Sequence, residues 1–228
     1  MIVLHQSETS PFCDKVRRLL HYKKRAFETH DVPIHESLVR VGSGSVAGEV
    51  PVIEHGGTAI ADSSDIARYL DRVFPDPPLY PEHPRDRALC HLLEDWADES
   101  LYFYELWFRF ALPHNAGESS RTATKSEPPL LRRAAEAALP TLMRNVLRAQ
   151  GIGRKDPEQV LAEFARHVES LAALLEGDWL VGSHLTVADV AVYAQLAYAL
   201  DTGEGAAVLA DRPRVLAWMS RVNASTAA

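Results

Sequence analysis

The sequence has few cysteines and no long apolar run, and each absence excludes a class of protein. Its 228 residues include only two cysteines, Cys13 and Cys90, so no disulfide framework can hold the fold together. No stretch approaches the roughly 20 apolar residues that span a membrane. The first residues, Met1-Ile2-Val3-Leu4-His5, lack the basic-then-apolar pattern of a signal peptide. We therefore expect a cytoplasmic protein with no membrane partner.

The chain also lacks an excess of positive charge. It holds 24 lysines and arginines against 31 aspartates and glutamates, which gives a net charge of −7. Nucleic-acid binding depends on clustered Lys and Arg, so this balance argues against a nucleic-acid partner. The ten histidines show no H-x-x-x-H spacing, and we predict no metal site.

Strand and helix patterns alternate in the first part of the chain. Residues 2–4 form a short apolar run typical of a buried strand, and a second strand is predicted over 27–32. Between them, Ser10 and Pro11 have the residue types of a helix N-cap and a first helical position. This order predicts a β-α-β unit.

A β-hairpin is predicted over 50–60, because two apolar runs flank the turn residues Gly56 and Gly57. A helix follows Asp62, whereas residues 33–49 give no firm helix pattern. The combined order predicts an α/β domain in which helices pack on a small sheet.

A proline-rich segment over 75–81 cannot continue a helix and marks a domain boundary. We expect an α/β domain over 1–75, a linker over 76–83 and an all-α domain over 84–228. Helices are predicted at about 84–112, 130–149, 157–176, 186–201 and 213–222, and residues 113–129 are predicted to form a mobile surface loop.

Ser10 is the first candidate for chemistry. A hydroxyl at a helix N-terminus lies among unpaired N–H groups and the positive end of the helix dipole, where a thiolate is stabilised. The alternative is that Ser10 acts only as a helix cap. Ser10 and Cys13 have the spacing of a C-x-x-C motif in which serine replaces the first cysteine. A dithiol cycle needs both sulfurs and is therefore excluded, and we interpret Cys13 as a buried structural thiol.

Two further groups could hold a ligand. Pro51 begins a strand, where it needs an edge position or a cis peptide bond after Val50, and a cis bond would turn the main chain of Val50 toward a groove. Asp62 and Ser63 open a helix with a carboxylate, a hydroxyl and free N–H groups, which suit an amino-acid headgroup. Each of these groups also has a purely structural interpretation, as an edge proline and as an N-cap.

Farther along the chain, Thr186 and Asp189 have the spacing of a capping box, which we assign to folding. The predicted helix over 84–112 is rich in aromatic residues. Tyr104 and Phe108 share one of its faces, and they belong either to the core or to the wall of an apolar pocket.

In their order along the chain, these features resemble the glutathione transferase family. The resemblance is carried by residues 10–17, by 49–53, by Asp62-Ser63 and by the stretch over 179–189, so it covers nearly the whole chain. It implies a thioredoxin-like N-terminal domain, an all-helical C-terminal domain and a homodimer. It also implies a transferase in which glutathione, as co-substrate, attacks a small apolar electrophile in detoxification.

Under this resemblance, Ser10 matches the serine that hydrogen-bonds the glutathione thiolate in some classes. Val50, before Pro51, matches the residue whose main chain pairs with the cysteinyl unit, and Asp62 and Ser63 match the acid-serine pair at the γ-glutamyl end. Phe12, Tyr104 and Phe108 are expected to wall the electrophile pocket.

The chain departs from the family before Val50. Over residues 42–49, where members often carry a lysine, the chain has none, so a basic contact to the glycine carboxylate is missing there. His35 and Arg40 are the available substitutes. Two alternatives to a transferase stay open: a non-catalytic glutathione-transferase-like binding or interaction module, and a glutathione-dependent reductase acting through Cys13.

Overall fold

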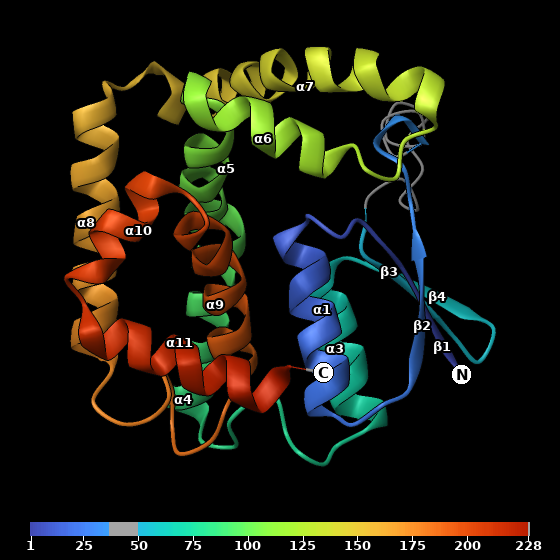
Figure 1. Ribbon diagram of the computed structural model, residues 1–228. Helices are drawn as coiled ribbons and strands as arrows, with labels where there is room; N and C mark the ends of the chain where they lie inside the picture. The colour runs from blue at the N-terminus through green and yellow to red at the C-terminus, as the bar shows by residue number, and fades with distance from the viewer. Residues whose placement is uncertain (37–49, 228) are drawn as a thin grey trace.

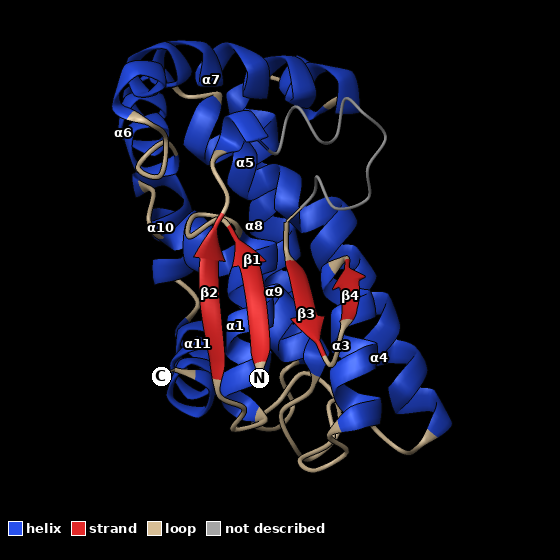
Figure 2. Cartoon of the chain, turned by 90° about the vertical axis from the view of Figure 1, so that its right-hand side faces the viewer, coloured by secondary structure: helices blue, strands red, loops and turns tan. Residues whose placement is uncertain are grey.

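A four-stranded sheet forms the centre of the first part of the chain. The computed structural model describes residues 1–36 and 50–227. The strands are β1 (Ile2–Gln6), β2 (Phe27–Asp31), β3 (Val52–His55) and β4 (Thr58–Ala61), in the spatial order β2-β1-β3-β4. β1 is parallel to β2 and antiparallel to β3, and β3 and β4 form the predicted hairpin (Figure 2).

Two helices, α1 (Pro11–Tyr22) and α3 (Ser63–Val73), lie on one face of this sheet, between the sheet and the rest of the molecule (Figure 1). Their apolar residues recur at helical spacing and are buried against Leu4 and Ile53 of the sheet. The expected β-α-β then β-β-α order is confirmed. It brings the N-termini of α1 and α3 to the side of the domain that faces the helical part of the chain.

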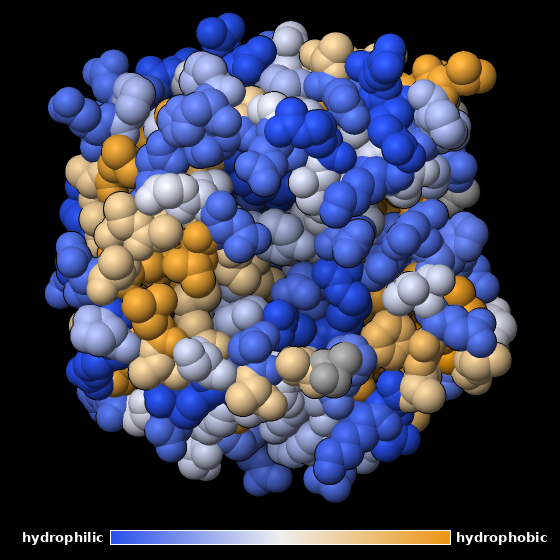
Figure 3. All heavy atoms as spheres, in the orientation of Figure 1, coloured by the Kyte–Doolittle hydropathy of each residue, from blue (hydrophilic) through white to orange (hydrophobic). Residues whose placement is uncertain are grey.

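The rest of the chain is helical. In order, its elements are α4 (Pro84–Trp96), a π-helical turn (Ala97–Leu101), α5 (Tyr102–Phe110), α6 (Pro113–Ala123), α7 (Pro129–Gln150), a 3-10 turn (Ile152–Arg154), α8 (Pro157–Leu174), α9 (Val187–Leu200), α10 (Gly203–Ala210) and α11 (Pro213–Thr226). Apolar side chains gather over α8 and α10 in the view of Figure 3, whereas the middle of that face is hydrophilic. None of the helices in the described ranges is long and apolar enough to cross a bilayer.

Helix α9 is the most buried element, and its N-terminus has the predicted capping box. Asp189 accepts hydrogen bonds from the Thr186 N–H and hydroxyl at 2.9 Å, from the Leu180 N–H at 2.8 Å and from Trp218 Nε1 at 2.8 Å. The carboxylate therefore ties together α9, the segment before it and α11.

Three helix predictions were wrong. The single helix over 84–112 is interrupted by the π-helical turn, and the loop over 113–129 is largely helix α6. The buried side of α6 consists of Ala116, Ser120 and Ala123, which are too small to give an apolar pattern. Helix α10 was not predicted because glycines lower helix propensity. Gly205 is required there, since an added Cβ would lie 2.1 Å from the carbonyl oxygen of Ala199.

Candidate functional site

Ser10 is the N-cap of α1, as the sequence predicts. Its Oγ accepts a hydrogen bond from the Cys13 N–H at 3.4 Å, and its side chain is partly exposed. A hydroxyl can accept and donate at the same time, so its proton stays available for an anion at the helix N-terminus.

Cys13 is a buried thiol, as we interpreted it. It has no exposed surface, its Sγ accepts a hydrogen bond from the Ser7 N–H at 3.3 Å, and neither it nor Cys90 forms a disulfide. Burial raises the pKa of Cys13 to about 11, although the bonds from Ser7 and Ser10 oppose the shift. A nucleophilic thiol needs the opposite shift, so this environment argues against a reductase acting through Cys13.

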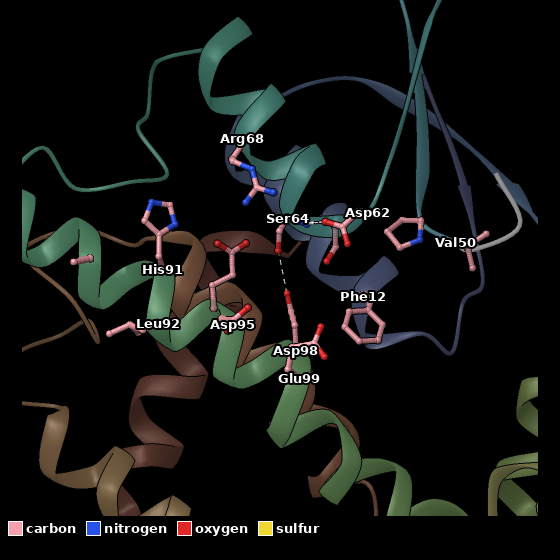
Figure 4. Close-up of a pocket in the computed structure, with 14 residues that line it drawn as sticks. Phe12, Val50, Asp62, Ser64, Arg68, His91, Leu92, Asp95, Asp98 and Glu99 are labelled. Atoms are coloured by element: carbon pink, nitrogen blue, oxygen red, sulfur yellow. Dashed lines mark hydrogen bonds between the residues drawn. The ribbon is translucent and has the colours of Figure 1, made fainter. Parts of the chain in front are cut away.

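The ligand candidates of the first domain other than Ser10 line one pocket of about 770 Å³. Val50, Pro51, Asp62 and Ser63 all line it, together with Phe12 (Figure 4). The peptide bond between Val50 and Pro51 is cis, which is one of the two conformations expected for a proline at this position. The pocket therefore brings together side chains from α1, the start of β3 and the start of α3.

Asp62 caps α3 through one oxygen. Its Oδ1 accepts hydrogen bonds from the N–H groups of Ser64 at 2.9 Å and Asp65 at 3.0 Å. Both bonds end on Oδ1, so Oδ2 of this exposed residue stays free to accept from a ligand. Ser63 beside it is 4% exposed.

A buried lysine, which was not predicted from the sequence, donates hydrogen bonds to two serines that line this pocket. Lys15 of α1 is 1% exposed and donates to Ser63 Oγ at 3.3 Å and Ser64 Oγ at 3.0 Å. Its Nζ also lies 2.8 Å from Glu94 Oε1 and 2.7 Å from Asp98 Oδ2. Burial alone would lower the pKa of Lys15, but the two carboxylates outweigh it and raise the pKa.

Asp98 of the helical domain also lines this pocket. It lies in the π-helical turn, its side chain is 11% exposed, and its Oδ2 accepts from Lys15 and from Ser64 Oγ at 3.1 Å (Figure 4). Its buried Oδ1 has no hydrogen-bond partner among the described residues. Burial raises the pKa of Asp98, against the attraction of Lys15. A cationic ligand group in the pocket would satisfy this oxygen.

A second, smaller pocket of about 190 Å³ lies beside Ser10. It is lined mainly by apolar side chains, and Phe12 belongs to the walls of both pockets. The apolar and aromatic lining residues, besides Phe12, are Pro11, Ile34, Tyr102, Leu106, Phe110, Ala123, Leu139 and Met143. The N-terminus of α1 thus contributes Ser10, Pro11 and Phe12 to the apolar pocket, and Phe12 also to the polar one.

The structure places neither Tyr104 nor Phe108 in this apolar pocket, which corrects our expectation. Phe108 has no exposed surface and packs edge-to-face on Phe164, 4.9 Å between ring centroids. Tyr104 donates to Glu163 Oε2 at 3.1 Å and faces α8. The adjacent face of α5, with Tyr102 and Leu106, lines the pocket instead. The extra residue per turn of the π-helix rotates the following side chains, and uniform helical spacing could not predict that rotation.

Of the two proposed substitutes for the missing lysine, only His35 lies within the described residues. His35 is held by buried Glu127, which accepts from the His35 N–H at 3.0 Å and contacts its Nδ1 at 2.6 Å. Arg40 and Glu49 lie outside the described residues. Within residues 1–36 and 50–227, no group of three or more His, Cys, Asp or Glu could hold a metal ion.

Comparisons with known proteins converge on one family. A model described as "Glutathione S-transferase, N-terminal domain" matches residues 4–78, and one described as "Glutathione S-transferase, C-terminal domain" matches residues 128–221. A probable glutathione transferase from Aplysia californica is 30% identical over 80 residues, which are 35% of this chain and 87% of that protein.

A probable glutathione S-transferase from Nicotiana tabacum is 31% identical over 93 residues, 40% of this chain and 42% of the relative. The matched part thus spans about two fifths of that plant relative. The crystal structure of a rice glutathione S-transferase in complex with glutathione superposes with a TM-score of 0.68 at 21% identity, and covers 99% of this chain and 88% of the rice chain. At this identity the likeness shows the fold.

Proposed function

The chain belongs to the glutathione S-transferase family, and we propose that it is an enzyme that stabilises the thiolate of glutathione at Ser10 for attack on a small apolar electrophile. One observation carries the proposal: Ser10 lines the apolar pocket at the N-terminus of α1, and Phe12, two residues on, belongs to the walls of both this pocket and the polar one. We also propose that it works in the cytoplasm.

Glutathione matches the polar pocket group by group. Its γ-glutamyl carboxylate would accept from Ser63 and from N–H groups at the N-terminus of α3, where the helix dipole favours an anion. Its ammonium would donate to the free oxygens of Asp62 and Asp98. The main chain of Val50 would pair with the cysteinyl unit, which directs the thiol toward Ser10.

Ser10 would act by lowering the pKa of the bound thiol. A free thiol has a pKa of about 8.5, so little thiolate is present at neutral pH. A hydroxyl donor together with a helix N-terminus would lower this value by about one to two units. The thiolate sulfur then forms a bond to the electrophilic carbon, and the leaving group departs with the electron pair of the broken bond.

Titration of the folded protein with reduced glutathione in a calorimeter tests the first step. We expect binding in the micromolar-to-millimolar range, because the pocket offers both donors and acceptors to the γ-glutamyl end. No detectable heat from a protein shown to be folded by circular dichroism would overturn the proposal.

Substitution of Ser10 tests the chemistry. We expect Ser10→Ala to lower kcat for glutathione conjugation by about 10- to 100-fold, the fall in thiolate fraction that follows the loss of one to two pKa units. Glutathione affinity should change little. Cys13→Ala is the matched control three residues away and should keep most of the activity. An unchanged kcat in Ser10→Ala would remove Ser10 from the mechanism.

A further inference from the structure

A buried carboxylate belongs to the wall of the apolar pocket beside Ser10. Glu105 of α5 is 1% exposed and lines this pocket. Its Oε2 accepts a hydrogen bond from Arg109 Nη1 at 3.2 Å. Its buried Oε1 has no hydrogen-bond partner among the described residues. One oxygen of the carboxylate is therefore hydrogen-bonded, and the other is not.

Such a group is costly in this setting. Removing a carboxylate oxygen from water is unfavourable unless a hydrogen bond replaces the lost solvation. The pocket is lined by apolar residues such as Leu106 and Leu139 and by the hydroxyl-bearing Ser7, Thr9 and Ser10. Among the described residues, none of these hydroxyl groups is hydrogen-bonded to Oε1. A purely apolar pocket would serve an apolar electrophile better, so the position of Glu105 calls for a polar partner.

The charges around Glu105 restrict what that partner is. Arg109 already supplies the positive charge, and it also donates to the Thr9 carbonyl at 3.4 Å, so a second cation would be repelled. An anion would be repelled by Glu105 itself. Burial raises the pKa of Glu105 and Arg109 opposes the shift. A neutral hydroxyl suits the carboxyl group in either protonation state, because it both donates and accepts.

We propose that Glu105 is a specificity-determining residue that recognises a hydroxyl group on an otherwise apolar, aromatic-sized electrophile. This inference rests on the proposed function, since it concerns the second substrate of the same site. Arg109 positions the carboxylate through Oε2, and the substrate hydroxyl bonds to Oε1. The pocket would then select hydroxylated aromatic electrophiles over their unsubstituted analogues.

Binding of unreactive conjugates tests this without relying on turnover. S-benzylglutathione and its 2-, 3- and 4-hydroxybenzyl counterparts differ only in one hydroxyl group. By calorimetry we expect at least one hydroxylated conjugate to bind wild-type protein about tenfold more tightly than S-benzylglutathione, the effect of one hydrogen bond to a charged group.

Three variants assign the preference. Glu105→Leu should abolish the tenfold advantage, and Glu105→Gln, which preserves the shape, should reduce it to about two- to threefold because a neutral amide is a weaker partner. Leu139→Ala, at an apolar lining residue from α7, should weaken both conjugates alike and keep their ratio. Should Glu105→Leu fail to fold, the comparison of Glu105→Gln with wild type decides.

Two results would overturn the inference: no hydroxylated conjugate binds wild-type protein more tightly, or the advantage persists unchanged in the Glu105 variants. Either leaves the proposed function standing if S-benzylglutathione and glutathione bind. Failure of glutathione and of every conjugate to bind folded wild-type protein would overturn both proposals.

Discussion

At the scale of single residues, the most informative group is Asp98, because it links the two parts of the chain at the polar pocket. One of its oxygens bonds to Lys15 and Ser64, and the other is buried without a partner among the described residues. In Asp98→Asn, the amide would keep one acceptor for Lys15 and turn an NH2 group toward the ligand ammonium. We therefore expect the affinity for glutathione, measured by calorimetry, to fall about tenfold.

Asp95→Asn is the matched control for this prediction. Asp95 lines the same pocket from the same stretch of helix but is exposed, so water screens its charge and the affinity should change less than twofold. Equal losses in the two variants would show that general negative charge, and no specific contact, governs binding.

The sequence predicted the part of this pocket that lies in short motifs. Val50, Pro51, Asp62 and Ser63 each stand at the start of a strand or helix, where local chemistry and family resemblance both mark them. Lys15 and Asp98 carry no such mark, since their pairing joins residues 83 positions apart. A buried lysine in an amphipathic helix has the same sequence pattern as an exposed one.

At the scale of elements, prediction succeeded where large apolar residues set the period and failed where small residues did. α7, α8 and α9 follow the predicted ranges closely, whereas α6 is buried through alanine and serine, and α10 through Gly205 and a single large residue, Leu209. The π-helical turn is the unpredicted element that matters most for the site, because it decides which face of α5 lines the apolar pocket.

The capping box of α9 gives the test at this scale. Asp189 has no exposed surface and accepts four hydrogen bonds, which an asparagine side chain cannot all accept because its NH2 group would face N–H donors. We expect Asp189→Asn to lower the free energy of unfolding in urea by about 2–4 kcal/mol. Asp178→Asn, at an exposed surface pair with Arg221, should change it by less than about 0.5 kcal/mol. A comparable small change in both variants would contradict the structural role assigned to Asp189.

At the scale of the whole molecule, we propose that two copies associate, as the family resemblance implies, and that the α4 side forms the contact. Leu92 of α4 is 68% exposed and is one of the residues that line the polar pocket, so a second copy there would shield both an apolar side chain and the ligand. Leu130, 95% exposed, lies on α7 at the other end of the helical part (Figure 1).

Sedimentation equilibrium should give twice the 25.3 kDa of one chain. We expect Leu92→Lys to raise the dissociation constant of the dimer at least tenfold and Leu130→Lys to leave it unchanged, because only the first places a charge in the contact. A single species of 25.3 kDa at every concentration would exclude the dimer, and the reverse ranking of the two variants would move the contact to α7.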